Sequence, residues 1–348
     1  MDYDFAHPPV SEITADLKGV AILLWGANGT GKTPIACGFE KPYYLGFESG
    51  LTGIRGIPNQ VIGSWKKFIE FVKWATNPAT TAQAHEVAQT IILDTVDVMG
   101  DYCSDFVCSR LGVSSIGEVR LNAEGKKDGS INAYKELGLE FKRRTRALRT
   151  AGFTLVYIAH DGGYRDDVDP VTHQKYTKMY PSGDKRVIEP ICDDVDVIAY
   201  LQAAPLDPNG HPVYSTAFFA PNPLFHARSR YAEIVPYVQM ATAKNIAEAI
   251  ITAKQKELER TGSSAVTYEE QVKPFIPDQA LTLDEMKSEI GRIARALYDA
   301  DEDHHRKSEY DAIVEQDWGK GNKVSDAKDE NYEVLSLILS DLKGLEIA

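Results

Sequence analysis

Cysteine is scarce in this sequence of 348 residues, and its four thiols follow no metal-binding or disulfide pattern. No two cysteines are spaced as C-x-x-C, and the closest pair, Cys103 and Cys108, is five residues apart. Zinc sites built on C-x-x-C pairs are therefore excluded, and disulfide frameworks belong to small secreted domains. The thiols are predicted to be free and mostly buried, in a reducing compartment.

Long apolar runs and an excess of positive charge are also lacking. No segment approaches the roughly 18 apolar residues that a membrane span needs, and the acidic start lacks the basic region of a secretory signal. We therefore expect a cytoplasmic protein that does not enter a membrane. The formal net charge is −13, so nucleic acid could bind only through a local basic surface. From Pro236 onward there are 14 Lys and Arg against 23 Asp and Glu, so most of the acidity lies in the last third.

The first two thirds of the sequence alternate strand-like and helix-like segments. Continuous apolar runs are typical of strands that are covered on both faces, and such runs occupy residues 20–25, 90–94 and 153–160. Further strands are predicted at 42–48, 195–203 and 212–220, the last two around the turn signal Asn209-Gly210, and helices at 64–76 and across 131–148. This alternation predicts an α/β core with a mainly parallel sheet over residues 18–236, preceded by an arm at 1–17.

After residue 236 the pattern becomes helical. A helix over 241–262 is predicted to end at Gly262, and a second over 282–300 begins with the capping box of Thr282 and Glu285. A last helix is predicted at 331–345. These helices predict an acidic helical appendage over 240–348, in which 260–280 and 301–330 are loops or disordered segments.

A phosphate-binding motif follows the first apolar run. The sequence GANGTGKT at 26–33 fits G-x-x-x-x-G-K-[ST], the P-loop. Its glycines let successive backbone N–H groups face an anion, and the N-terminus of the following helix adds a favourable dipole. Lys32 is expected to reach the β- and γ-phosphates and Thr33 to bind Mg²⁺. The predicted ATP-binding residues are Gly26, Ala27, Asn28, Gly29, Thr30, Gly31, Lys32, Thr33 and Pro34.

A second metal ligand is predicted at Asp94, which ends the apolar run TIIL as in a Walker B motif. Parallel strands deliver such a carboxylate to the sheet edge beside the P-loop. Apolar strands that end in aspartate are common, so Asp94 is predicted to bind the metal only because a P-loop precedes it in the sequence.

The residue that activates water is less obvious, because Thr95 occupies the place where many P-loop ATPases have glutamate. Glu48 ends the second predicted strand and is the first candidate for the catalytic base, with Asp97 as the alternative. A protein that binds ATP without hydrolysing it is the other interpretation. His160 ends the strand LVYIAH and is either a sensor of the γ-phosphate or a buried structural histidine.

Taken together, these residues resemble the RecA-like P-loop ATPases, and most closely the small phage-type members that assist single-strand annealing and recombination. The resemblance covers about 18–235 and includes Ile158-Ala-His160, the strand from Asp196 to Leu201, and Arg228-Ser-Arg230. It implies ATP bound at an interface between copies of the chain, with Arg228 or Arg230 reaching the γ-phosphate of a neighbour.

The resemblance also implies that the loop after His160 touches single-stranded DNA. Residues 161–186 show no apolar period and are predicted to be a loop without regular structure. The loop mixes aromatic and basic side chains, which suits stacking on bases and contact with phosphates: Tyr164, Tyr176, Tyr180, Arg165, Lys175, Lys178, Lys185 and Arg186. A second basic cluster on the long predicted helix either faces solvent or contacts DNA or another subunit: Lys142, Arg143, Arg144, Arg146 and Arg149.

The sequence thus predicts a RecA-like ATPase that uses ATP and Mg²⁺ and acts on single-stranded DNA in phage recombination or replication. Two alternatives are a nucleotide-switched binding module without turnover and, with less support, a small-molecule kinase. The acidic appendage is predicted to dock a partner protein or to screen DNA from the core.

Overall fold

The computed structural model describes residues 10–48, 50–51, 53–118, 132–169, 171–210, 213–272, 281–299, 305–328 and 331–346. The chain divides into two compact units, a core over residues 9–274 and a helical unit that begins at Phe275. Among the described residues, the core has two buried apolar clusters and the helical unit has one.

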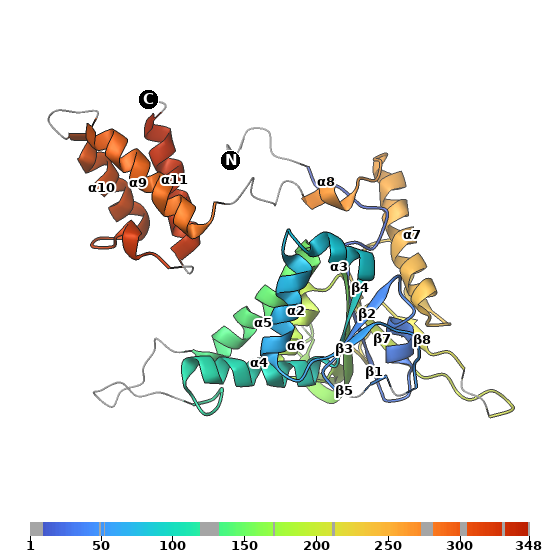
Figure 1. Ribbon diagram of the computed structural model, residues 1–348. Helices are drawn as coiled ribbons and strands as arrows, with labels where there is room; N and C mark the ends of the chain where they lie inside the picture. The colour runs from blue at the N-terminus through green and yellow to red at the C-terminus, as the bar shows by residue number, and fades with distance from the viewer. Residues whose placement is uncertain are drawn as a thin grey trace. The chain divides into compact units, whose positions relative to one another are not determined.

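The core is built on a mixed, mainly parallel sheet (Figure 1). The strand order is β10-β8-β7-β1-β5-β4-β2-β3, and the strands from β7 to β3 in this order are parallel. β8 and β10 continue the sheet in antiparallel fashion, β9 pairs with β7, and β6 pairs with β5. The strands are β1 (Ala21–Gly26), β2 (Pro42–Gly46), β3 (Asn59–Val61), β4 (Thr90–Asp94), β5 (Thr154–Val168), β6 (Lys175–Pro181), β7 (Val197–Gln202), β8 (Thr216–Phe218), β9 (Arg228–Ser229) and β10 (Tyr237–Val238).

Helices cover both faces of this sheet (Figure 1). α2 (Trp65–Thr76), α4 (Val96–Leu111), α5 (Ala133–Thr150) and α6 (Lys185–Asp194) supply apolar side chains to one cluster, and α1 (Lys32–Ala36) and α7 (Ala243–Thr261) supply the other. Along β1, Leu23 and Trp25 join the first cluster, whereas Ile22 and Leu24 join the second. This two-sided burial explains the continuous apolar run in the sequence. Two short helices complete the core, α3 (Thr81–Val87) and α8 (Tyr268–Val272).

The parallel register brings the ends of four strands to one edge of the sheet. Gly26 lies opposite His160, Gly46 lies opposite Asp94, and Asp94 lies opposite Ile158. The predicted fold class, an α/β core with a mainly parallel sheet and a C-terminal helical region, is confirmed.

The prediction of an unstructured segment at 161–186 was wrong. β5 continues past the sheet to Val168 and pairs with β6 in a hairpin, and α6 begins at Lys185. Residues alternate between exposed and half-buried along this part of β5, but none of the half-buried ones, Gly163, Arg165 and Asp167, is apolar in the way a core strand requires. A search for alternating apolar residues therefore misses the strand.

The boundary expected at residues 236–240 also differs from the structure. α7 contributes Ile246 and Ile250 to the cluster that includes Ile22, so it belongs to the core. The described part of the N-terminal arm contacts this helix, because Lys254 Nζ donates to Thr14 Oγ1 at 2.9 Å. α7 ends at Thr261, and Gly262 follows it as the C-cap in the left-handed conformation, as predicted.

The helical unit contains α9 (Leu283–Asp299), α10 (His305–Trp318), a short 3-10 helix η2 (Val324–Asp326) and α11 (Tyr332–Glu346). The Thr282–Glu285 capping box is confirmed, since each residue's backbone N–H donates to the other's side chain, at 2.7 and 3.2 Å. The prediction of a loop at 301–330 was wrong where α10 lies. Its sequence carries few apolar residues among many charges, so it has only a weak amphipathic pattern.

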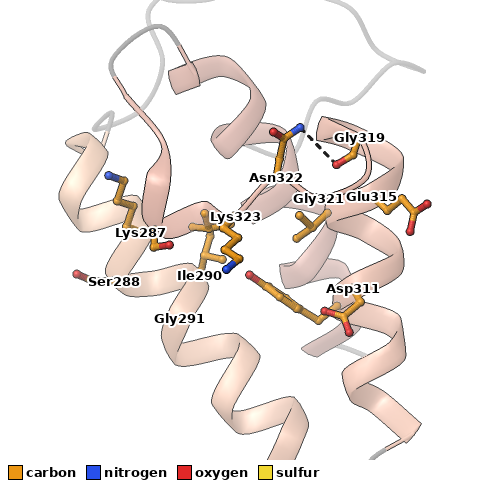
Figure 2. Close-up of a pocket in the computed structure, with 14 residues that line it drawn as sticks. Lys287, Ser288, Ile290, Gly291, Asp311, Glu315, Gly319, Gly321, Asn322 and Lys323 are labelled. Carbon is orange, nitrogen blue, oxygen red and sulfur yellow. Dashed lines mark hydrogen bonds between the residues drawn. The ribbon is translucent and has the colours of Figure 1, made fainter.

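The helical unit also holds a hollow of about 750 Å³ between α9, α10 and the turn that follows α10 (Figure 2). Charged and polar side chains line much of it, among them Lys287, Asp311, Glu315, Asn322 and Lys323. It contains none of the residues predicted to bind nucleotide.

Candidate nucleotide-binding site

The P-loop joins the carboxyl end of β1 to α1. Gly29 and Gly31 have φ angles of 83° and 79°, which residues with a side chain rarely adopt. Thr30 closes the loop by donating from Oγ1 to the Ala27 carbonyl at 2.9 Å, and Ser215 Oγ donates to the Thr30 carbonyl at the same distance. The contact within the loop and the contact from Ser215 thus hold the loop backbone in a conformation that suits an anion-binding nest.

Lys32 lies folded over this loop. Its side chain is buried, and Nζ donates to the carbonyls of Gly26 at 2.9 Å and Ala27 at 3.0 Å. Burial lowers the pKa of Lys32, and the charges of Asp94, Asp161 and Asp97 offset this only in part. Within the part of the chain that the structure describes, no carboxylate forms an ion pair with this ammonium group, so its charge can attract a phosphate.

Thr33 and Asp94 meet as predicted. Thr33 Oγ1 donates to Asp94 Oδ2 at 2.8 Å, although the residues are 61 positions apart. Tyr44 donates its hydroxyl to the same carboxylate oxygen at 3.0 Å. Asp94 is only 3% exposed; burial raises its pKa, and the hydrogen bonds from Thr33 and Tyr44 lower it.

The donor set of this edge fits Mg²⁺. Hydroxyl and carboxylate oxygens are the hard ligands that Mg²⁺ prefers. Among the residues that the structure describes, no cluster of three or more metal-ligating side chains exists. A cation held here by Thr33 and Asp94 would take its other ligands from phosphate and water, which is the usual arrangement for Mg²⁺.

Glu48 and His160 form a second pair at this edge. The distance from His160 Nε2 to Glu48 Oε1 is 3.5 Å, and the two side chains are 37% and 43% exposed. The buried Nδ1 of His160 has no hydrogen-bond partner among the described residues. Because Gly46 lies opposite Asp94 and His160 lies opposite Gly26, the Glu48–His160 pair and the Thr33–Asp94 pair lie at the same ends of neighbouring strands.

Two residues of this site were not predicted. Tyr44 lies on β2, four residues before Glu48, and reaches Asp94 across the sheet. Thr95 is 1% exposed, and its Oγ1 has no partner within the described part of the chain. The position of Thr95 after the Walker B aspartate could have identified it from the sequence, whereas Tyr44 has the sequence pattern of an ordinary buried strand residue.

Asp97, the alternative base, lies in the first turn of α4 and accepts from the Val98 N–H at 3.0 Å.

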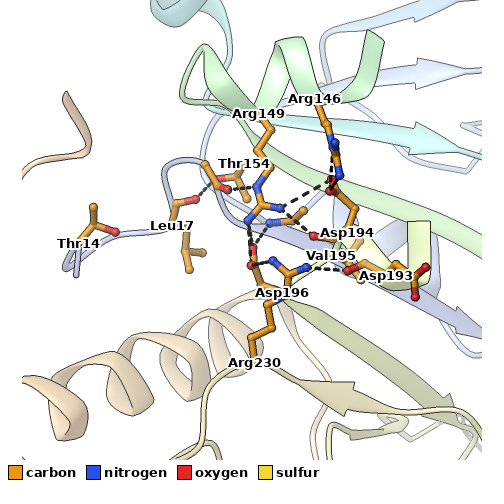
Figure 3. A network of polar contacts seen from close by, with 12 residues as sticks. Thr14, Leu17, Arg146, Arg149, Thr154, Asp193, Asp194, Val195, Asp196 and Arg230 are labelled. Carbon is orange, nitrogen blue, oxygen red and sulfur yellow. Dashed lines mark hydrogen bonds and ion pairs between the residues drawn. The ribbon is translucent and has the colours of Figure 1, made fainter. Parts of the chain in front are cut away.

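Arg228 and Arg230 lie at the other edge of the sheet (Figure 3 for Arg230). Arg228 donates to the carbonyls of Cys192, Asp193 and Val195, where α6 ends. Arg230 donates to the Asp193 carbonyl at 2.6 Å. Because β9 pairs with the amino end of β7, both arginines lie opposite the P-loop edge of their own chain. Any nucleotide that they contact would belong to another copy.

The basic cluster on α5 is largely engaged inside the chain (Figure 3). Arg149 donates to Asp196, to the Gly19 carbonyl and to the Asp194 carbonyl. Arg146 pairs with Asp194 at 2.7 Å, and Arg144 pairs with Glu140 at 2.8 Å. Arg144 and Arg149 are half-buried by these contacts, whereas Arg143 and Arg146 are the members most open to solvent, with side chains that are 68% and 58% exposed.

The β5–β6 hairpin has two different faces. On the inner face, the Tyr180 ring lies 5.3 Å from the Arg165 guanidinium and stacks on His226 at 5.0 Å. The hydroxyls of Tyr176 and Tyr180 both donate to Asp167 at 3.0 Å. On the outer face, Tyr164 is 71% exposed. Only part of the predicted aromatic and basic set therefore faces solvent.

The four thiols are free, as predicted: Cys37, Cys103 and Cys108 are buried, and Cys192 is half-buried. Among the described residues, none of the helices is both long and apolar enough to cross a lipid bilayer.

The P-loop, the Thr33–Asp94 pair and the parallel sheet define a P-loop nucleotide-binding protein. The family described as AAA domain matches residues 18–231, and the chain belongs to this family. The chain is also 34% identical over 347 residues, 99% of both proteins, to a protein of Bacillus subtilis (strain 168) named SPbeta prophage-derived uncharacterized protein YorG. A KaiC-like protein from Pyrococcus horikoshii matches 60% of this chain and 88% of its own, with 12% identity and a TM-score of 0.31. A TM-score this low does not establish a common fold.

Proposed function

We propose that this protein binds Mg-ATP at the P-loop edge of the sheet and hydrolyses it. The observation that carries the proposal is the 2.8 Å contact between Thr33 and Asp94, directly beside the glycine-rich loop and Lys32. In this assignment the loop N–H groups and Lys32 bind the phosphates, and Thr33 and Asp94 hold Mg²⁺. The bound cation would neutralise charge on the phosphate oxygens.

Glu48 is the proposed base that orients and activates water. It lies at the same edge as Asp94, and about two fifths of its side chain is open to solvent, so water can reach it. His160 lies 3.5 Å away, and we assign it to sense the γ-phosphate and orient Glu48. His160 lies in β5, at the end of the part that pairs with the P-loop strand β1, so movement at the phosphate can reach the hairpin that β5 forms beyond it.

The proposed polymer substrate is single-stranded DNA, bound at the outer face of the β5–β6 hairpin. The hairpin is a direct extension of β5 beyond His160, and Tyr164 and Lys175 are exposed on it. An exposed ring stacks on any base, and a nearby cation tracks the phosphates. The match to a prophage-derived protein supports a phage origin, and recombination or replication is the process that we propose for a protein that acts on single-stranded DNA there.

We further propose that copies of the chain associate with ATP between them. Arg228 and Arg230 lie at the edge opposite their own P-loop, as an arginine that serves a neighbour must.

The acidic helical unit is proposed to dock a partner protein or to repel DNA from the core. Residues 275–348 hold 9 Lys and Arg against 18 Asp and Glu.

The test is the ATPase rate of the wild type, Lys32→Ala and Glu48→Gln, each with and without single-stranded DNA. We expect both variants to lose at least about a hundredfold in turnover. Glu48→Gln should still bind Mg-ATP in calorimetry, whereas Lys32→Ala should bind weakly. Glu70→Gln, on the exposed face of α2, is the matched control. Equal rates in all four proteins would remove the hydrolytic assignment.

One specific observation favours a second function, a nucleotide-switched binding module. Thr95 follows Asp94 where many P-loop ATPases have glutamate, and it supplies no carboxylate. Tight Mg-ATP binding by the wild type with no turnover would support this alternative.

A further inference from the structure

Tyr44 makes a contact that is part of neither the P-loop motif nor the Walker B motif. Its hydroxyl donates to Asp94 Oδ2 at 3.0 Å, and Thr33 donates to the same oxygen at 2.8 Å. Tyr44 is 3% exposed. Thr33 belongs to the nucleotide loop, but Tyr44 is part of a sheet strand, so its hold on Asp94 does not depend on the conformation of that loop.

Two glycines make room for the Tyr44 side chain. A Cβ atom at Gly46 would lie 2.7 Å from the edge of the ring, at Cε1. A Cβ atom at Gly50 would lie 2.1 Å from the Tyr44 hydroxyl oxygen and 3.4 Å from Asp94 Oδ2. The ring therefore lies against the backbone on both sides of Glu48, and any larger residue at these positions would displace it.

We propose that Tyr44 is a positioning residue that fixes the Asp94 carboxylate for the cation and ties it to the segment that carries Glu48. The inference rests on the proposed function and deepens it. A carboxylate held by two donors from different elements has one orientation, and partners of this kind set the affinity of the ligand for its metal. The contact also links the metal ligand and the proposed base through one side chain.

The test measures how Mg²⁺ increases the affinity for a fluorescent ATP analogue in wild-type protein, Tyr44→Phe and Tyr43→Phe. In EDTA, we expect Tyr44→Phe to bind the analogue within about twofold of the wild type, because the phosphate loop is unchanged. The Mg²⁺ concentration for half-maximal enhancement should rise about tenfold, as for other partners of metal ligands. Tyr43 is the matched control, because its ring packs on Phe71 at 5.4 Å, in the other apolar cluster.

Gly50→Ala provides a second, independent variant. The added methyl group would collide with the Tyr44 hydroxyl, so the variant should reproduce the Mg²⁺ defect of Tyr44→Phe. Gly53→Ala is its control, since a Cβ atom there meets nothing within 4 Å. In the double variant Tyr44→Phe/Gly50→Ala, the two effects should be far from additive, because both act on one contact.

Unchanged Mg²⁺ dependence in Tyr44→Phe would overturn the inference and leave the proposed function standing. An equal loss of analogue affinity with and without Mg²⁺ would also overturn it, because that result assigns Tyr44 a purely structural role. Wild-type protein that binds no analogue under either condition would overturn the proposed function and this inference together.

Discussion

Nη2 of Arg149 donates to both carboxylate oxygens of Asp196, at 2.8 and 2.7 Å. Asp196 in turn binds the amino end of β1, because its Oδ2 accepts from the Ala21 N–H at 2.9 Å. The pair therefore joins α5 to the start of two neighbouring strands (Figure 3). It lies at the amino ends of these strands, whereas the P-loop follows the carboxyl end of β1.

Removing Arg149 should destabilise the core strongly. Arg149→Ala leaves the Asp196 carboxylate, which is 6% exposed, with Arg230 as its remaining cationic partner at 3.5 Å. Loss of one member of a buried ion pair costs about 3 kcal/mol in free energy of unfolding. Urea unfolding followed by fluorescence measures this loss. Arg143→Ala, with a side chain that is 68% exposed, is the control and should change stability by less than about 0.5 kcal/mol. Equal effects of the two substitutions would contradict the assignment.

The hairpin is expected to loosen in acid because of His226. Burial lowers the pKa of His226 to about 4, and the positive charges of Lys178 and Arg228 add to this. The folded state thus favours neutral imidazole, so its contribution to stability is complete above the unfolded pKa of about 6.5 and is lost as the pH falls toward 4. We expect the Tm to fall by several degrees over this range, and less in His226→Phe, which retains the stack on Tyr180. Parallel Tm curves for the two proteins would contradict this prediction.

Much of the fold follows from the sequence because the sheet is buried on both faces. Local sequence patterns predict the apolar strands β1, β4 and β5 and the P-loop between β1 and α1. The structure contains each of them at the predicted place. The hairpin and α10 lack such signals: the hairpin packs Arg165 and His226 against Tyr180 instead of an apolar row, and α10 has only a weak amphipathic pattern. The core position of α7 depends on which surface its apolar face covers, which no local pattern specifies.

The site residues also divide into those that the sequence predicts and those that only the structure identifies. Thr33 and Asp94 are recognisable because each belongs to a motif, and parallel strand ends meet at one edge. The contact of Tyr44 with Asp94 depends on the direction of one ring and on the space above Gly46 and Gly50. These are properties of packing and not of spacing along the chain.

Tyr164 should contribute to binding of single-stranded DNA. Tyr164→Ala removes an exposed ring from the outer face of the hairpin without disturbing a buried contact. One stacked base contributes about 1–3 kcal/mol, so we expect the Kd to rise about tenfold. Fluorescence anisotropy with a labelled oligonucleotide, at one fixed salt concentration, measures it. Tyr298→Ala, at an exposed position of α9, is the control, and a similar Kd for both variants would exclude base stacking at Tyr164.

Removal of the helical unit should strengthen DNA binding. A chain that ends at Pro274 keeps both apolar clusters of the core and loses a segment with a net charge of −9, from 9 basic and 18 acidic residues. We expect its affinity for single-stranded DNA to increase several-fold at low salt, and the difference to shrink at high salt. ATP-analogue affinity should stay the same, which checks that the truncated core is folded. Weaker DNA binding by the truncated chain would assign the unit a direct role in DNA contact.

The substitutions Arg228→Ala and Arg230→Ala should have different effects on stability and activity. Arg228 donates to three main-chain carbonyls at the end of α6, groups that have no partner within the helix, so Arg228→Ala should lower the Tm by several degrees. Arg230 is 44% exposed and donates to one of these carbonyls, so Arg230→Ala should change the Tm less.

If Arg230 completes the site of a neighbour, its loss should reduce the ATPase rate at least about tenfold at unchanged ATP-analogue affinity. Mixing Arg230→Ala with Glu48→Gln then provides the decisive measurement. Each inactive chain supplies what the other lacks, so the mixture should recover activity, whereas two defects confined to single chains cannot complement each other.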